Sequence, residues 1–101
     1  MNGKFLIQVS CMYKAHLPTL IYIPGQLVLN EHTIIFKSYY TNHNPLNLDI
    51  DVKKIIRYQV RKGLLGHKLF IYYNQTWYKF SHFKSKDIQT LVHHINEIQA
   101  L

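Results

Sequence analysis

Positive charge is concentrated in the second half of this 101-residue chain. Six lysines and arginines fall within residues 53–68 with no acid among them: Lys53, Lys54, Arg57, Arg61, Lys62 and Lys68. Clustered cations attract anionic partners such as a membrane surface or a nucleic acid. The formal net charge of the whole chain is +7. Two interpretations therefore stay open: an anionic-ligand site, or lysines that only solvate the surface of a protein with a biased composition.

Aromatic side chains follow the basic stretch at the spacing of a β-strand. The runs 68–73 and 76–80 predict a β-hairpin that turns at Asn74-Gln75, with Leu69, Ile71, Tyr78 and Phe80 inside. Phe70, Tyr72, Trp77 and Lys79 then lie on its outward face, next to Arg57 and Arg61. Aromatics mixed with arginines are typical of protein interfaces and of platforms for single-stranded nucleic acid. A solvated face, or a face covered by a second copy of the chain, would show the same pattern.

These patterns predict two overlapping sets of site residues. The partner-binding set is Arg57, Arg61, Phe70, Tyr72, Trp77 and Lys79. The set for an anionic ligand or membrane is Lys53, Lys54, Arg57, Arg61, Lys62 and Lys68. The leading hypothesis is protein binding or self-association through the outward face of residues 55–79. Peripheral binding to anionic lipid is the alternative, and nucleic-acid binding is a weaker one.

Catalytic and metal-binding motifs are missing from the sequence. It has no glycine-rich phosphate loop, no nucleophile elbow and only five acids. The seven histidines show no zinc-site spacing, and the adjacent His93 and His94 would point about 100° apart on a helix. We therefore expect a non-enzymatic protein without a cofactor or a metal.

The single cysteine, Cys11, permits no intrachain disulfide. The apolar run before it is shorter than the core of a signal peptide, and no stretch approaches the roughly 18 apolar residues of a membrane span. The sequence thus predicts a single domain over residues 1–101. It predicts a cytoplasmic protein, which in the lipid-binding alternative is peripheral to the membrane.

The elements that would position these side chains are mostly strands. The segment 25–36 predicts a hairpin with Glu31-His32 at its turn, so that Leu27, Leu29, Ile34 and Phe36 form one apolar patch. Residues 4–14, 46–52 and 55–61 also alternate like strands. Residues 15–19 suggest a connection marked by Pro18, Pro24-Gly25 suggests a bulge or bend, and 41–45 and 62–66 predict loops. Near the C-terminus, apolar residues change to helical spacing and predict a helix over about 86–99.

The stretch 17–23 has two interpretations. Its β-branched residues fit a buried strand. As an exposed apolar loop, the same residues would insert shallowly into a bilayer or cover a partner. The sequence alone leaves both open.

About seven strands followed by one helix resemble the pleckstrin-homology (PH) superfold, and within it the GRAM-like and bacterial PH-like domains. The residues that carry the resemblance are Gly25 to Asn30 with Ile34 to Phe36, Leu48 to Ile50 with Ile55-Ile56, and Tyr78 to Phe80. The resemblance implies a mainly β, partly open barrel closed by the helix, and a module that binds proteins or membrane lipids. Lipid-binding relatives place several cations in the loop after the first strand, whereas here no Lys or Arg lies between Lys14 and Lys37.

Overall fold

The computed structural model describes residues 7–17, 19–39 and 48–101. Seven strands and one helix follow one another: β1 (Ile7–Leu17), β2 (Thr19–Leu29), β3 (Thr33–Ser38), β4 (Leu48–Asp51), β5 (Arg57–Gly63), β6 (Gly66–Tyr73), β7 (Thr76–Phe83) and α1 (Ser85–Ala100). A short 3-10 helix, η2 (Val52–Lys54), joins β4 to β5. The predicted fold class is confirmed: seven antiparallel strands form one open sheet, which is followed by a C-terminal helix.

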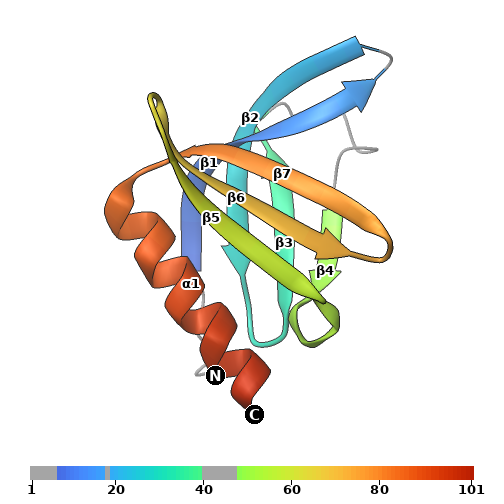
Figure 1. The fold of residues 1–101 in the computed structure, drawn as a ribbon, viewed down its shortest axis with the longest axis vertical. Helices are drawn as coiled ribbons and strands as arrows, with labels where there is room; N and C mark the ends of the chain where they lie inside the picture. The colour runs from blue at the N-terminus through green and yellow to red at the C-terminus, as the bar shows by residue number, and fades with distance from the viewer. Residues whose placement is uncertain (1–6, 18, 40–47) are drawn as a thin grey trace.

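The sheet bends back on itself, so that β5, β6 and β7 cross in front of β2, β3 and β4 (Figure 1). Its strand order is β4-β3-β2-β1-β7-β6-β5, and the bend lies where β1 pairs with β7 through Met12 with Ser81 and Tyr13 with Phe80. The helix α1 buries Ile88, Leu91 and Ile95. It thereby covers the apolar interior that the bent sheet leaves open.

Both predicted hairpins have the expected register. Leu27 pairs with Phe36 and Leu29 with Ile34, and all four side chains are buried. In the second hairpin Leu69 pairs with Phe80 and Tyr72 with Trp77. The alternation of apolar residues was sufficient to predict the register of both hairpins, because a slip by one residue would turn each buried side chain towards solvent.

The expected connection over residues 15–19 is wrong. β1 continues to Leu17 and β2 begins at Thr19, and the two strands pair without interruption from Ile7 with Leu29 to Leu17 with Thr19. The strands extend this far because each supplies backbone hydrogen-bond partners for the other. The predicted loop over residues 41–45 and the strand positions before Ile7 lie outside the described residues.

The expected interruption at Pro24-Gly25 is also wrong, because β2 runs through both residues. The glycine is required by packing. A Cβ atom at Gly25 would lie 2.3 Å from the carbonyl oxygen of Lys37 and 2.7 Å from the ring of Phe36. Gly25 therefore allows β3 and its buried phenylalanine to lie close to β2.

The stretch 17–23 combines the two interpretations. Leu17 ends β1 and residues 19–23 belong to β2, yet Leu20, Ile21 and Tyr22 are exposed, while Ile23 is buried. The reason is that the β1–β2 hairpin projects beyond the rest of the sheet (Figure 1).

Candidate functional site

The outward face of β5, β6 and β7 carries the predicted partner-binding residues in transverse rows. Arg57, Tyr72 and Trp77 lie in register across the three strands. Phe70 and Lys79 form the next row together with Gln59. Residues that pair directly share one face of a sheet, so five of the six predicted residues lie in these two rows and Arg61 continues them along β5.

Ring contacts organise this face. The rings of Tyr72 and Trp77 lie 5.0 Å apart, and the guanidinium carbon of Arg61 lies 5.9 Å from the centre of the Phe70 ring. Trp77 is 39% exposed although it contacts Tyr72. The face thus presents a pre-ordered aromatic patch bordered by two arginines.

At one end of this face is a groove of about 850 Å³, which we call the lysine groove. Its cations are Lys14 from β1, Lys62 and Lys68 from the β5–β6 hairpin, and Lys79 from β7. Apolar and aromatic residues line the rest, and they include Met12, Tyr22, Leu64, Leu65 and Phe70. No acid is among the described residues that line the groove, so the four ammonium groups attract an anion together.

A β-bulge shapes the floor of the groove. The pairing of β6 with β7 shifts register between His67 and Leu69, and opposite this shift His82 has a φ of 67°. As a result Phe83 is buried and His82, half-buried, lines the groove. Bulges redirect side chains in this way, and they often do so beside binding sites.

The redirected His82 contacts two neighbours. Its Nδ1 atom lies 2.7 Å from the Oγ atom of Ser81, and its ring lies 6.4 Å from the ring of Tyr22 on β2. The groove therefore joins the projecting β1–β2 hairpin to β7 across the bend of the sheet.

Gly66 closes the other side of the groove. Its φ of 112° is a conformation that side chains rarely adopt, and a Cβ atom there would lie 2.9 Å from the carbonyl oxygen of Phe83. The glycine allows the β5–β6 hairpin to turn tightly at Leu64-Leu65 against the bulge. The predicted loop over residues 62–66 is thus shorter than expected, because Gly63 already pairs with Gly66.

Two apolar hairpin ends flank the lysine groove. Leu64 and Leu65 are exposed at the end of the β5–β6 hairpin, and Leu20, Ile21 and Tyr22 are exposed on the β1–β2 hairpin. Both hairpins project at the end of the molecule away from the C-terminus (Figure 1). Cations and exposed aliphatic side chains therefore occur together at this end.

The residues predicted for an anionic ligand divide into three groups. Lys62 and Lys68 line the lysine groove. Arg57 and Arg61 lie on the outward face of β5, whereas Lys53 and Lys54 belong to η2. The Lys53 ammonium donates a hydrogen bond to the carbonyl oxygen of Leu101 at 3.1 Å. The structure thus brings only part of this set together.

Sequence reasoning missed Lys14, Tyr22 and His82 as groove residues. Lys14 is isolated in the sequence, because the next Lys or Arg is Lys37. Its alternation with the inward Tyr13 was an available signal that it points outward. No local signal in the sequence predicts the pairing of β1 with β7, which brings Lys14 and Lys79 to the same groove.

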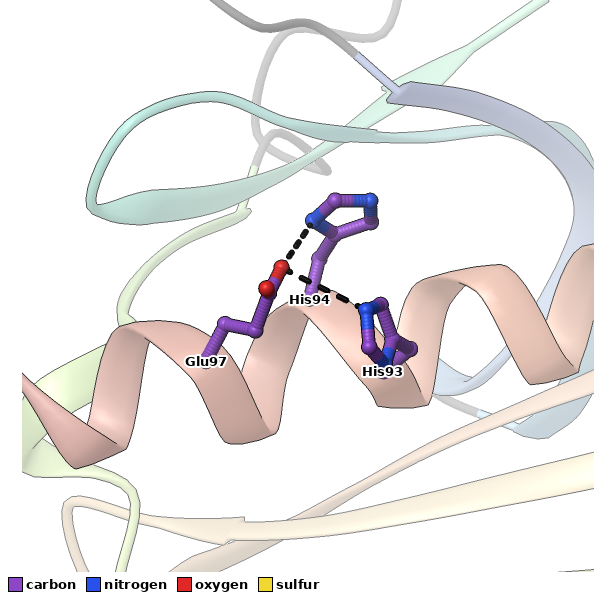
Figure 2. A network of polar contacts seen from close by, with 3 residues as sticks. All are labelled: His93, His94 and Glu97. Atoms are coloured by element: carbon purple, nitrogen blue, oxygen red, sulfur yellow. Dashed lines mark ion pairs between the residues drawn. The ribbon is translucent and has the colours of Figure 1, made fainter.

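A second polar cluster lies on α1 (Figure 2). One carboxylate oxygen of Glu97 lies 2.9 Å from Nδ1 of His94 and 3.6 Å from Nε2 of His93. The two imidazoles thus reach the same oxygen, although adjacent positions on a helix point about 100° apart. Within the described residues, no three His, Cys, Asp or Glu side chains are arranged to hold a metal ion.

Among the described residues, no helix has the length and apolarity needed to cross a membrane. No protein-family model matches the sequence, and a search of curated protein sequences returns no significant relative.

Solved structures are similar to this chain in fold. The C-terminal domain of an unknown protein from Leishmania infantum has a TM-score of 0.73 at 13% identity, over 92% of this chain and 85% of that one. The Vps36 N-terminal PH domain has a TM-score of 0.65 at 14% identity, over 97% of this chain and 81% of that one. At such low identities the likeness shows the fold alone, and that fold is PH-like.

Proposed function

We propose that this chain is a non-catalytic binding module that attaches peripherally to anionic membranes through the lysine groove and the two hairpin ends beside it. The observation that carries the proposal is the meeting of four lysines with exposed leucines at one end of the molecule. PH-like folds serve chiefly as binding modules, but the fold does not determine the ligand, so the proposal rests on this surface. The finer resemblance to GRAM-like domains stays a prediction.

The four lysines of the groove would contribute substantially to the affinity for an anionic membrane. A lysine near an anionic leaflet contributes about 1 kcal/mol, so the four groove lysines together contribute about 4 kcal/mol. That energy corresponds to an increase in affinity on the order of a thousandfold. Insertion of Leu64 and Leu65 would add a contribution that salt does not screen.

Vesicle sedimentation tests this proposal. We expect the protein to sediment with vesicles that contain phosphatidylserine, to be partly released when the salt concentration is raised, and to stay in the supernatant with vesicles of phosphatidylcholine alone. No sedimentation with the anionic vesicles at low salt would refute the proposal.

A second candidate function is protein binding or self-association through the aromatic patch. Trp77 favours it, because an exposed tryptophan against Tyr72 and in register with Arg57 combines residue types that are enriched in interface hot spots. Nucleic-acid binding by the same face stays a weaker prediction.

Light scattering tests self-association. We expect the wild type to show a concentration-dependent increase in mass and Trp77→Ala to weaken it about thirtyfold or more, because loss of a hot-spot residue costs about 2 kcal/mol. Tyr39→Ala is the matched control, since Tyr39 is an exposed aromatic residue outside the patch. A wild type that stays monomeric throughout would exclude self-association and leave only a different protein as partner.

A further inference from the structure

The backbone at His82 is unusual for a residue within a strand. Its φ of 67° lies in the left-handed region, where residues other than glycine are uncommon. The other described non-glycine residues with a positive φ, Asn74 and Gln75, form the tight turn between β6 and β7, where such angles are favoured. Strained backbone away from a tight turn is concentrated at functional sites. His82 is therefore a candidate for a role in binding.

The bulge places the His82 imidazole in the wall of the lysine groove, where it is half-buried. Its Nδ1 atom lies 2.7 Å from the Oγ atom of Ser81, and its ring meets the ring of Tyr22 at an interplanar angle of 72°. A hydroxyl group can donate a hydrogen bond to a neutral imidazole nitrogen or accept one from a protonated nitrogen. The contact with Ser81 is thus compatible with both charge states of His82.

The charged groups that share the groove with His82 all have the same sign. They are the lysines Lys14 from β1, Lys62 and Lys68 from the β5–β6 hairpin, and Lys79 from β7. The titratable group from β2 is the phenol of Tyr22, while His67 on β6 pairs with Phe83 and does not line the groove. No acid is found among the described lining residues. An external anion therefore has no carboxylate of the groove to compete with for a protonated His82.

Protonation would make His82 a fifth cation of the lysine groove. Histidine is the side chain whose charge ordinarily changes between about pH 5 and about pH 8. An anionic leaflet at the groove attracts this additional charge together with the lysines. Because the two binding events are linked, the leaflet favours the protonated imidazole, and the protonated imidazole favours the leaflet by the same factor.

We propose that His82 makes attachment through the lysine groove dependent on pH, so that the protein binds anionic membranes more tightly in mildly acidic surroundings than in mildly alkaline ones. This regulation rests on the membrane function proposed above. The expected gain is about fivefold in affinity, which is the contribution of one added cation at an anionic leaflet.

Vesicle sedimentation at constant ionic strength, at about pH 8 and about pH 5.5, tests this regulation. The probe is a vesicle of phosphatidylcholine with phosphatidylglycerol, whose phosphodiester keeps one negative charge over this range, so that only the protein changes its charge. We expect the wild type to bind about fivefold or more tightly at the lower pH. The chain has seven histidines, so variants are needed to assign the change to one of them.

His82→Asn is the test variant, because asparagine is neutral and tolerates a positive φ. It should bind within about twofold of the wild type at the higher pH and lose most of the gain at the lower pH. His32→Asn is the matched control and should keep the gain, because His32 lies in the turn after β2, where its carbonyl oxygen accepts a hydrogen bond from Val52, and it does not line the groove.

His82→Lys supplies a permanent charge at the same position. It should bind about fivefold more tightly than the wild type at the higher pH and gain less than the wild type on acidification. Circular dichroism establishes that all three variants are folded.

An equal pH dependence in the wild type and His82→Asn would overturn this regulation and leave membrane attachment itself intact. So would a loss of the gain in His32→Asn as large as in His82→Asn, because the gain would then follow the net charge. A wild type that sediments with the anionic vesicles at neither pH would refute the membrane function, and the regulation with it.

Discussion

Cys11 shows how the core controls the chemistry of a single residue. Its side chain is buried on the inward face of β1. Burial raises the pKa of the Cys11 thiol to about 12, and only the hydrogen bond with the backbone of Leu27 opposes the rise. Burial and the neighbouring Tyr78 likewise raise the pKa of Tyr13. The thiol is therefore neutral and unreactive at physiological pH.

This shift predicts a loss of stability in alkali. The thiol keeps its proton up to about pH 12 in the folded chain but loses it near the ordinary pKa of 9.0 once unfolded. The unfolded state therefore binds fewer protons between these values, and the free energy of unfolding falls as the pH rises through this range. Urea denaturation at several pH values should show the fall in the wild type.

Cys11→Ala is the control for this prediction. The variant should show a smaller fall over the same pH range, since Tyr13 still contributes in the same direction. An identical pH dependence in the two proteins would contradict the assignment to Cys11.

Residue-level prediction failed where the backbone departs from regular alternation. Counting by two from the inward Phe80 places His82 inside and Phe83 outside, but the bulge reverses this order. A bulge depends on the neighbouring strand, and so the letters of β7 did not reveal that His82 lines the lysine groove. Phe70, Trp77 and Lys79 lie in regular pairing, and their common face could be predicted.

At the level of elements, the β5–β6 hairpin presents its apolar end to the surroundings. We expect Leu64→Gln combined with Leu65→Gln to weaken binding to anionic vesicles about tenfold or more, because exposed leucines contribute only when they are withdrawn from water. Salt should leave this difference unchanged. Thermal unfolding should also be unaffected, since both side chains are exposed in the folded chain.

Ile56→Gln is the control for the hairpin end, because it changes another exposed aliphatic residue, which directly precedes β5 at the opposite end of that strand. A loss of vesicle binding as large in this variant as in the double leucine variant would exclude a specific role for the hairpin end.

The elements themselves were predictable to different degrees. Hairpins and the helix were recovered because contacts between sequence neighbours determine them, as in the pairing of Leu27 with Phe36. β1 and β2 are longer than predicted. Pro18 and Pro24 were expected to interrupt the strands, because proline has no N–H to donate to a neighbouring strand. Pro24 is accommodated within β2, opposite Met12.

On the scale of the whole molecule, the bend of the sheet creates the lysine groove. β1 pairs with β7 although more than 60 residues separate Tyr13 from Phe80 in sequence. This pairing brings Lys14 to the same groove as Lys68 and Lys79. The fold class could be predicted from the order of the elements, whereas the site depends on a contact distant in sequence.

The four lysines proposed to bind the membrane lie at one end of the molecule. The lysine groove lies between the projecting hairpins, whereas η2 lies at the other end, near the C-terminus (Figure 1). Replacing two lysines of the groove or the two lysines of η2 lowers the net charge by the same amount. A comparison of the two double variants therefore distinguishes a localised membrane site from attraction by the net charge alone.

The most direct test is therefore vesicle sedimentation with Lys14→Gln plus Lys68→Gln, compared with Lys53→Gln plus Lys54→Gln. At about 1 kcal/mol for each lysine, we predict that the first pair loses about thirtyfold in affinity for phosphatidylserine vesicles. The second pair should stay within about threefold of the wild type, because those lysines lie away from the groove. Equal losses in the two double variants would contradict a membrane site at the lysine groove.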